Sequence, residues 1–295
     1  MARILVGAPV AAALMEQIKR ETVLLAARGV IPVLALVRIG GREDDRAYER
    51  GIVKRAGDAG LTVRHAVLPE DAAHDKVLEL IRSLNTESAV HGILLFRPLP
   101  AHLDDAEICA AIDPAKDLDG VSPGSLAAVY SGGIAGEAGS AVRGGGFAPC
   151  TAEACIALLD HYGIGIEGKR FVVVGRSLVI GRPAAMLLLH RNATVTLCHS
   201  RTVNLAAVCR EADAVIAASG KRELLGAVHF SAGQTIIDVG IHLRQDGTLA
   251  GDVNFAEAEP LAADITPVPG GVGAVTTAVL LSHLVRAARR AGAGI

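Results

Sequence analysis

A turn bounded by two glycines is the clearest chemical feature of this 295-residue sequence. The apolar run 171–174 leads into Gly175, and Gly181 follows after five intervening residues, at the start of an apolar helical pattern. A strand, a glycine turn and a helix N-terminus together present free backbone N–H groups that can bind a pyrophosphate. We therefore expect a dinucleotide site that uses Gly175, Arg176, Ser177 and Gly181, although the spacing alone also fits an ordinary strand-to-helix turn.

The charges that follow this turn favour NADP over NAD. An NAD site usually places an acidic residue about 20 residues after the glycines, where it binds the ribose 2′-hydroxyl, whereas an NADP site offers cations to the 2′-phosphate. Between Gly175 and Glu211 the sequence contains several arginines and no acidic residue. We expect NADP to be the cofactor, with Arg176 and Ser200 as its phosphate contacts. The other arginines are expected to lie on a solvated face.

Apolar periodicity places the turn in the second of two α/β regions. Runs of strand length alternate with helical patterns in both halves, which predicts parallel sheets with right-handed crossovers and ligands at the carboxyl ends of the strands. The Gly-, Ser- and Ala-rich segment 122–148 is expected to be a loop-rich connection between two domains. The expected helices cover residues 10–28, 45–59, 75–84, 152–161, 184–190 and 274–290, and the expected strands cover 33–37, 61–68, 92–95, 171–174, 194–197, 214–217 and 235–239.

Composition excludes several classes of protein. The chain is 51% hydrophobic but only 3% aromatic, and its net charge is −2, so it is expected to fold around an aliphatic α/β core and to bind neither nucleic acid nor an anionic membrane. No apolar run reaches the ~18 to 20 residues of a membrane span, and the first residues form no secretory signal, so a cytoplasmic location is expected. The five cysteines show no metal-binding spacing, which predicts reduced thiols and no metal site.

Six segments, in order and spacing, resemble those of the methylenetetrahydrofolate dehydrogenase/cyclohydrolase family. They are residues 114–120, 168–183, 198–202, 237–241, 251–253 and 266–273. The resemblance covers nearly the whole chain. It implies a folate domain at 1–148, a Rossmann-like NADP domain at 149–272, and a last helix at 273–295 that returns to the first domain. It also implies an active-site cleft between the domains and a homodimer.

The same resemblance implies the chemistry. Family members transfer a hydride from 5,10-methylenetetrahydrofolate to NADP, and then hydrate the methenyl product to 10-formyltetrahydrofolate. Tyr48 matches the residue that packs on the folate, and Asp119 matches the carboxylate that binds the pterin. Further implied substrate contacts are Pro269, Gly270 and Gly273, and further implied cofactor contacts are His199, Ser200 and Ile241.

Two positions depart from the family pattern. Ile52 stands where the family keeps a catalytic Lys, four residues after the Tyr, and Phe96 stands where it keeps a Gln. Lys54 does not substitute for the missing Lys. At about 100° per residue it lies about 120° around the helix from Tyr48, whereas Ile52 lies about 40° away.

Loss of the Lys predicts loss of one of the two activities. Hydration needs a group that positions or deprotonates water, which Ile52 cannot do, so cyclohydrolase activity is expected to be lost or very weak. Hydride transfer needs mainly proximity and orientation, and should survive. Three alternatives stay open. They are a bifunctional enzyme, an oxidoreductase for a different pterin one-carbon adduct, suggested by Asp45 in place of a family Ser, and a non-catalytic folate- and nucleotide-binding module.

Two other acidic residues have expected structural roles. Asp238 and Asp252 follow or precede short apolar runs, and they are expected to cap or close turns at strand ends. Cys150 and Cys198 are expected to be small buried hydrophobic residues.

Overall fold

The computed structural model describes residues 1–133 and 145–292, which form two compact units. Unit 1 consists of Met1–Ala12 and Pro149–Val279, and unit 2 of Ala13–Ala148 and Leu280–Ile295. Each unit contains a parallel sheet, so the predicted two-domain α/β fold is confirmed. The assignment of 1–148, 149–272 and 273–295 to a folate domain, a nucleotide domain and a returning helix stays a prediction.

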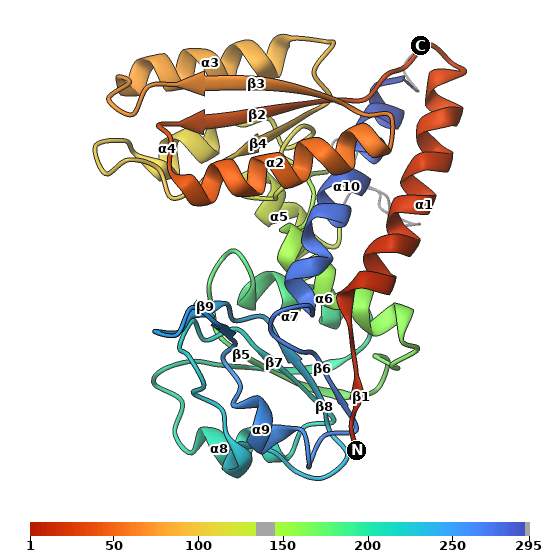
Figure 1. The fold of residues 1–295 in the computed structure, drawn as a ribbon, viewed down its shortest axis with the longest axis vertical. Coiled ribbons are helices and arrows are strands. Elements are labelled where there is room, and N and C mark those ends of the chain that lie inside the picture. Colours follow the sequence, from red (N-terminus) through yellow and green to blue (C-terminus); the bar gives the residue numbers. More distant parts are fainter. Residues whose placement is uncertain (134–144, 293–295) are drawn as a thin grey trace. The chain divides into compact units, whose positions relative to one another are not determined.

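Unit 1 is built on a six-stranded sheet (Figure 1). Its strands are β1 (Arg3–Ile4), β5 (Arg170–Val174), β6 (Thr194–Cys198), β7 (Ala214–Ala217), β8 (Thr235–Asp238) and β11 (Asp264–Ile265). They lie in the order β1-β11-β8-β7-β5-β6, and every pairing is parallel. Because β6 and β7 flank β5 on opposite sides, the order of strands reverses at β5. In doubly wound sheets such a reversal marks the edge where ligands bind.

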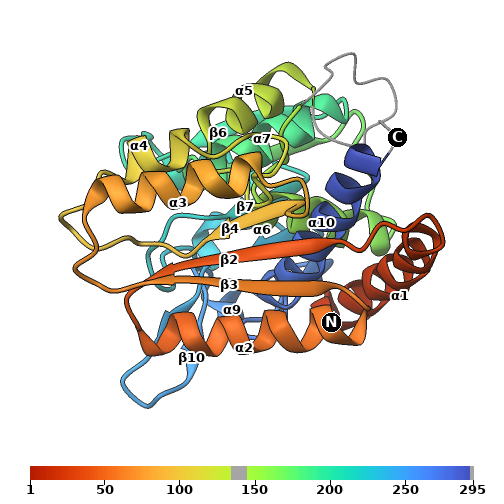
Figure 2. The same ribbon diagram turned by 90° about the horizontal axis from the view of Figure 1, so that it is seen from above.

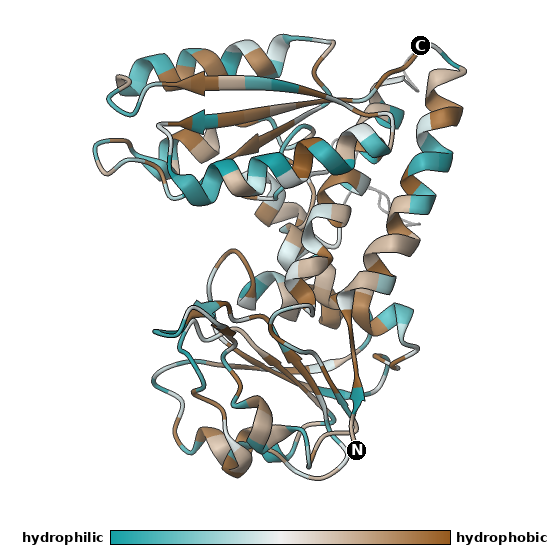
Figure 3. Ribbon diagram, in the orientation of Figure 1, coloured by the Kyte–Doolittle hydropathy of each residue, from teal (hydrophilic) through white to brown (hydrophobic). Residues whose placement is uncertain are grey.

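The remaining elements of unit 1 are short helices, one hairpin and one longer helix. They are α6 (Cys150–His161), α7 (Gly181–His190), α8 (Leu205–Arg210), η1 (Ala227–His229), β9 (His242–Leu243), β10 (Leu249–Ala250), α9 (Phe255–Ala258) and η2 (Val272–Ala274). The strands form near-continuous apolar runs, which Figure 3 shows in brown, because helices and loops cover both faces of a parallel sheet. Val172, Val215 and Ile236 are accordingly buried together in one core cluster.

Unit 2 contains a three-stranded parallel sheet in the order β3-β2-β4. Its elements are β2 (Val33–Ile39), α2 (Glu43–Asp58), β3 (Thr62–Leu68), α3 (His74–Thr86), β4 (Gly92–Leu95), α4 (Asp105–Ala110) and α5 (Pro123–Ser131). Two long helices each belong partly to unit 1 and partly to unit 2. The helix α1 (Gly7–Ala26) begins in unit 1 and ends in unit 2, and α10 (Thr276–Gly292) does the same.

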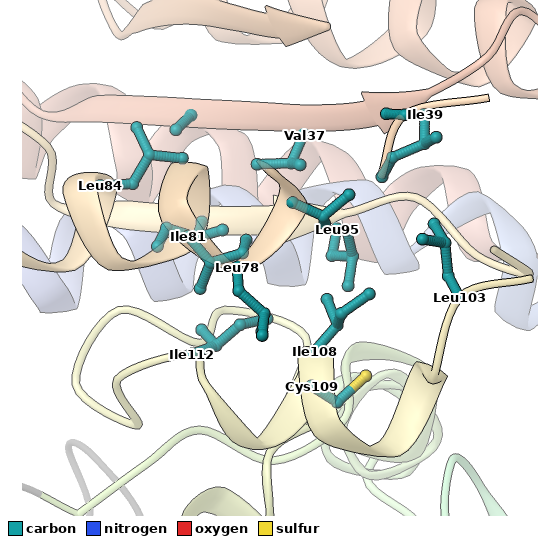
Figure 4. Packing of buried hydrophobic residues seen from close by; sticks show 14 of the residues in the cluster. Val37, Ile39, Leu78, Ile81, Leu84, Leu95, Leu103, Ile108, Cys109 and Ile112 are labelled. Atoms are coloured by element: carbon teal, nitrogen blue, oxygen red, sulfur yellow. The ribbon is translucent and has the colours of Figure 1, made fainter. Parts of the chain in front are cut away.

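The two faces of the unit 2 sheet carry different layers, because side chains alternate along each strand. Val37 and Ile39 of β2 and Leu95 of β4 pack against α3 and α4, as Figure 4 shows. Phe96 follows Leu95, so its side chain points to the other face of the sheet. Its ring contacts Tyr48 of α2, the helix that runs alongside this sheet in Figure 2.

The segment 122–148 departs from the expected loop. Its first part forms the helix α5, with Pro123 in the first turn. The Ser122 hydroxyl accepts a hydrogen bond from the Ser125 N–H at 3.2 Å, and Gly132 ends the helix in the left-handed conformation. These are ordinary start and stop signals that the Gly-rich composition obscured. Residues 134–144 lie outside the described part of the chain.

The other differences concern short elements. The sequence pattern missed β1, β11, α4, α8 and α9, which have between two and six residues each and are too short to show a period. The longer predicted helices and strands are present, with ends shifted by a few residues. All five cysteines are buried, as predicted for Cys150 and Cys198, and none of them forms a disulfide.

Candidate active site

The glycine turn between β5 and α7 is fixed by close backbone packing. Gly175 has φ +139°, and a Cβ there would collide with the carbonyl oxygen of Ala218, just after β7. A Cβ on Gly181 would collide with the carbonyl of Gly175 itself. Both glycines are therefore required by the backbone, and together they bring the start of α7 against the ends of β5 and β7. This geometry directs the N-terminus of α7 to the carboxyl edge of the sheet.

The turn after β6 lies beside the glycine turn. Val174 pairs with Cys198, and the Gly175 N–H donates to the Cys198 carbonyl at 2.9 Å. His199 closes the β6 turn, because its N–H donates to the Thr202 hydroxyl at 2.9 Å and its Nδ1 accepts from the Arg201 N–H at 3.1 Å. Most side chains at this edge are exposed, namely those of Arg176, Ser177, Ser200 and Arg201.

One of the nearby arginines has a structural role instead. Arg191 donates through both terminal nitrogens to Asp160 of α6, at 3.0 and 2.6 Å. It is thus an anchor between α6 and the end of α7, at the opposite end of this helix from the glycine turn. The sequence grouped Arg191 with the other cations, but this ion pair distinguishes it.

A cavity of about 240 Å³ opens at the carboxyl ends of β8 and β11. It brings together four residues that the resemblance implied separately, Ile241, Pro269, Gly270 and Gly273. A larger hollow, of about 350 Å³, lies at the opposite edge of the same sheet, around Arg170 and Asp213. We assign no ligand to the larger hollow, because parallel sheets bind ligands at their carboxyl edge.

In unit 2 the structure brings Tyr48 and Phe96 together. Their ring centroids lie 6.1 Å apart with an interplanar angle of 81°, which is an edge-to-face contact. Tyr48 is 41% exposed, whereas Phe96 is 7% exposed. The tyrosine ring therefore offers surface for a planar ligand, and the phenylalanine forms an apolar wall behind it.

The position of the family's Lys is filled by a buried aliphatic side chain. Ile52 has no exposed surface, while Lys54, two residues later, is exposed. Their different burial places the two side chains on different faces of α2, as the helical period predicts. No cation stands at position 52 to act on water.

The motif Lys116-Asp117-Leu118-Asp119 mixes structural and candidate binding groups. The Lys116 ammonium donates to the carbonyls of Leu84 and Glu87 at 2.9 and 2.7 Å, and burial lowers its pKa. The Asp117 carboxylate accepts hydrogen bonds from two backbone N–H groups just before α5. Asp119 is half-buried, and it is the residue of this motif that the family resemblance matches to the pterin-binding carboxylate.

Arg97 is a residue of this region that sequence reasoning missed. Its Nε and Nη2 donate to the two carboxylate oxygens of Asp105, at 2.8 and 2.5 Å. This pairing raises the pKa of Arg97, with a smaller contribution from Asp119. The guanidinium therefore lies within electrostatic reach of the candidate pterin carboxylate. The signal in the sequence was an arginine directly after Phe96.

Asp45, the other unusual residue of α2, is neutralised locally. Its carboxylate accepts two hydrogen bonds from Arg42, both at 2.8 Å, across the first turn of the helix. Asp45 is 8% exposed, and a buried charge of this kind needs a partner. Arg42 supplies that partner.

These features define a class of protein. A doubly wound sheet with a glycine turn at its switch point, joined to a second α/β unit with an exposed aromatic and a carboxylate, is the architecture of a two-domain dinucleotide-binding protein. Family models then identify it. Residues 5–119 match the catalytic domain of tetrahydrofolate dehydrogenase/cyclohydrolase, and residues 149–292 match its NAD(P)-binding domain. The chain belongs to this family, which confirms the predicted family and the predicted nicotinamide-cofactor domain.

Individual relatives agree over nearly the full length. Bifunctional protein FolD from Carboxydothermus hydrogenoformans is 44% identical over 289 residues, which are 97% of each chain. The solved FolD structure from Campylobacter jejuni has a TM-score of 0.92 at 34% identity and covers 98% of this chain and 99% of its own. The Trypanosoma brucei FolD, solved with NADP cofactor and inhibitor, has a TM-score of 0.88 at 34% identity and covers 98% of both chains.

Two kinds of feature are absent from the described part of the chain. Within residues 1–133 and 145–292, none of the helices has the length and apolar character to cross a membrane. In the same part of the chain, no group of three His, Cys, Asp or Glu side chains is arranged to hold a metal ion.

Proposed function

We propose that this chain oxidises 5,10-methylenetetrahydrofolate to the 5,10-methenyl cation with NADP, and that its cyclohydrolase activity is lost or very weak. The observation that carries the proposal is Ile52, which is fully buried on the Tyr48 side of α2 where the family keeps its catalytic Lys. The bifunctional activity named for the relatives is the competing hypothesis.

The residues of unit 1 fit NADP. Gly175 and Gly181 leave no room for a side chain, so the backbone can approach a pyrophosphate closely. Arg176, Ser200 and Arg201 offer hydrogen-bond donors and positive charge for the 2′-phosphate, and they lie at the ends of the neighbouring strands β5 and β6. When bound, the nicotinamide ring accepts the hydride.

Unit 2 supplies groups that bind and orient the folate. Tyr48 would stack on the substrate, and Asp119 would bind the pterin. Removal of a hydride leaves a positive charge on the one-carbon bridge, so a neutral Ile52 opposes that charge less than a Lys would. Orientation alone can lower a barrier by ~7 to 11 kcal/mol in favourable cases, so the oxidation does not need the missing Lys.

Hydration makes a different demand. Water must be positioned and deprotonated as it attacks the methenyl carbon, and general-base catalysis of this kind contributes ~10² to 10⁴-fold. Ile52 and Phe96 offer neither a proton acceptor nor a hydrogen bond. A dry wall here would spare the methenyl cation from water.

The test follows NADPH fluorescence and methenyl absorbance together after methylenetetrahydrofolate and NADP are added. We expect NADPH and methenyl product to rise in equal amounts, and methenyl product to decay no faster than in buffer alone. Enzyme-dependent decay of the methenyl product would overturn the loss of hydration. Binding of both ligands without NADPH formation would favour the non-catalytic module.

The same preparation tests the substrate class. Thermal-shift measurements with tetrahydrofolate and with other reduced pterins would separate the proposal from an oxidoreductase for a different pterin adduct. We expect stabilisation by the folate, because the Asp45 charge is already paired with Arg42. Stabilisation by another pterin alone would favour the alternative.

We further propose a cytoplasmic homodimer. The edge strand β6 supports the dimer, because Leu197 is 37% exposed on it and an unpaired edge is a surface for association. Five cysteines outside any disulfide are typical of a reducing compartment. Light scattering should give the mass of two chains, and fractionation should place the protein in the cytoplasm. A monomer mass would overturn the first proposal.

A further inference from the structure

The cavity at the ends of β8 and β11 has an unusual lining. Its walls consist of glycine, proline and aliphatic residues together with Asp238, which is the only titratable residue among those that line it in the described part of the chain. Asp238 ends β8 and is 4% exposed. A buried carboxylate in an apolar cavity needs hydrogen-bond donors, and here the backbone supplies them.

The Asp238 carboxylate joins two loops. It accepts hydrogen bonds from the N–H groups of Gly240 at 3.0 Å, Asp252 at 2.9 Å and Val253 at 2.9 Å. A Cβ on the neighbouring Gly251 would collide with the carboxylate, so this glycine is required for the approach. The loop after β8 and the segment after β10 are thereby held together by one side chain.

The main chain of Asp238 reaches the opposite wall of the cavity. Its N–H donates to the Thr266 hydroxyl at 2.7 Å, and Thr266 directly precedes the Pro267–Gly273 wall. Across the cavity, the Ile241 side chain lies so close to Gly273 that a Cβ there would meet its Cδ1 at 3.2 Å. Asp238 therefore connects both walls.

A second carboxylate supports the first. Asp252 has no exposed surface, and it accepts the N–H groups of Ser219 and Gly220, at 2.5 and 3.0 Å, just after β7. Its other oxygen lies 2.7 Å from Nε2 of His242 on β9. These contacts fix Asp252 itself, so the donors that reach Asp238 are fixed as well.

We propose that Asp238 is a positioning residue for the cofactor, whose ionised carboxylate fixes the Gly240–Ile241 wall against which the nicotinamide end of NADP packs. This inference rests on the proposed use of NADP. The cavity lies three strands from β6, so the phosphate contacts and the cavity would hold opposite ends of one dinucleotide. Protonation of Asp238 would weaken the wall, because a neutral carboxyl accepts backbone N–H groups less strongly.

The site can titrate in the physiological range. Burial raises the pKa of Asp238 to about 6, against the opposing effect of its three backbone donors, and the nearby Asp252 charge raises it further. The titratable groups that face it are Asp252 and, through Asp252, His242. The cavity wall that faces it from Pro267 to Ala274 carries no charged side chain.

The experiment compares NADPH dissociation constants of the wild type and Asp238→Asn between pH 5 and 8. The 2′-phosphate also titrates near pH 6, so each comparison is made between proteins with the same ligand. We expect the variant to bind NADPH about tenfold more weakly at pH 8, and the ratio to approach one at pH 5, where the wild-type residue is protonated too. A purely structural role would give a ratio that does not change with pH, and that result would overturn the proposal.

A fragment and two variants sharpen the test. Adenosine 2′,5′-bisphosphate lacks the nicotinamide, so its ratio should stay near one at every pH. Asp213→Asn removes a carboxylate that accepts the Arg170 N–H at the opposite edge of the sheet, and it should behave as the wild type. His242→Ala keeps the three donors to Asp238. If His242→Ala, with Asp238 still present, abolished the pH dependence of NADPH binding, His242 would be the titrating group and the proposal would be wrong.

Two further outcomes are distinguishable. If the wild type bound no NADPH at any pH, the proposed cofactor would fail and this inference with it. If Asp238→Asn did not fold, the wild type alone would supply the test. Its affinity for NADPH relative to adenosine 2′,5′-bisphosphate, which carries the same 2′-phosphate, should then fall below pH 6, and a constant ratio would overturn the proposal.

Discussion

The candidate nucleotide site in unit 1 is built from main chain, whereas the candidate folate site in unit 2 is built from side chains. Gly175 and Gly181 are fixed by collisions that any Cβ would cause, and Asp238 acts on backbone N–H groups. Tyr48 and Ile52, by contrast, project from one face of a regular helix. A helix accepts almost any non-Gly, non-Pro residue at such positions, because its backbone does not depend on them.

The difference explains which activity can change while the fold is kept. On the proposed function, an exchange at position 52 would alter the chemistry and leave α2 intact, because Ile52 is buried within a regular helix. An exchange at Gly175 would alter the backbone on which the whole nucleotide edge depends. Chemistry carried by a side chain can therefore be lost while the fold is kept, whereas binding carried by the backbone is lost only together with local structure.

The largest effect is expected for Gly175→Ala. The new Cβ would meet the Ala218 carbonyl, and φ is +139°, so we expect the free energy of unfolding of unit 1 to fall by about 3 kcal/mol or more, with loss of NADPH binding. Urea unfolding and fluorescence titration measure both. Gly165→Ala is the matched control, because nothing lies within 4 Å of its Cβ position. Equal behaviour of the two variants would contradict a backbone-built site.

The next effect is a gain of activity. Restoring the family's residues with Ile52→Lys and Phe96→Gln should raise the methenyl decay rate about 10²-fold over the wild type, since a general base is returned to the wall. Methenyl absorbance measures this decay, and Ile52→Met, which keeps the wall apolar, should leave it unchanged. If the double variant folded, by thermal melting, and still failed to hydrate, position 52 would not explain the loss.

A smaller effect is expected at the phosphate contacts. Arg176→Gln should weaken NADP binding about tenfold and leave NAD binding unchanged, because one charge-assisted hydrogen bond is lost. Arg191→Gln is the control, since Arg191 is paired with Asp160. Isothermal titration with both cofactors measures the preference. An equal loss for NAD would show that Arg176 contacts a part common to both dinucleotides.

The smallest effect concerns stability and pH. The pKa of Asp238 is about 6 in the folded chain and near 3.8 when unfolded, so between these values the native state binds more protons than the unfolded state. The contribution of Asp238 to the free energy of unfolding should therefore fall as pH rises from 4 to 6, by about 1 kcal/mol per pH unit. Urea unfolding of the wild type should show this slope relative to Asp238→Asn. Parallel curves for the two proteins would contradict it.

Local sequence patterns were enough for part of this structure. The alternation of strands and helices, the glycine turn and the position of Ile52 on the Tyr48 face all follow from periods of two or 3.6 residues. The same reasoning failed for α5, where Gly-rich flanks hid the signals at Ser122 and Pro123. It also failed for the pair β1 and β11, whose pairing partners lie 261 residues apart in the chain.

The sequence by itself determined the fold class, the family and the residue types at the candidate site, because short-range periodicity and ordered motifs carry that information. Only the tertiary structure decided which of those residues meet. It set the ring of Phe96 against Tyr48, paired Arg191 with Asp160, placed Arg97 near Asp119, and made Asp238 the link between two loops. Such contacts join segments far apart along the chain, and they are fixed by packing and by the need of buried charges for partners.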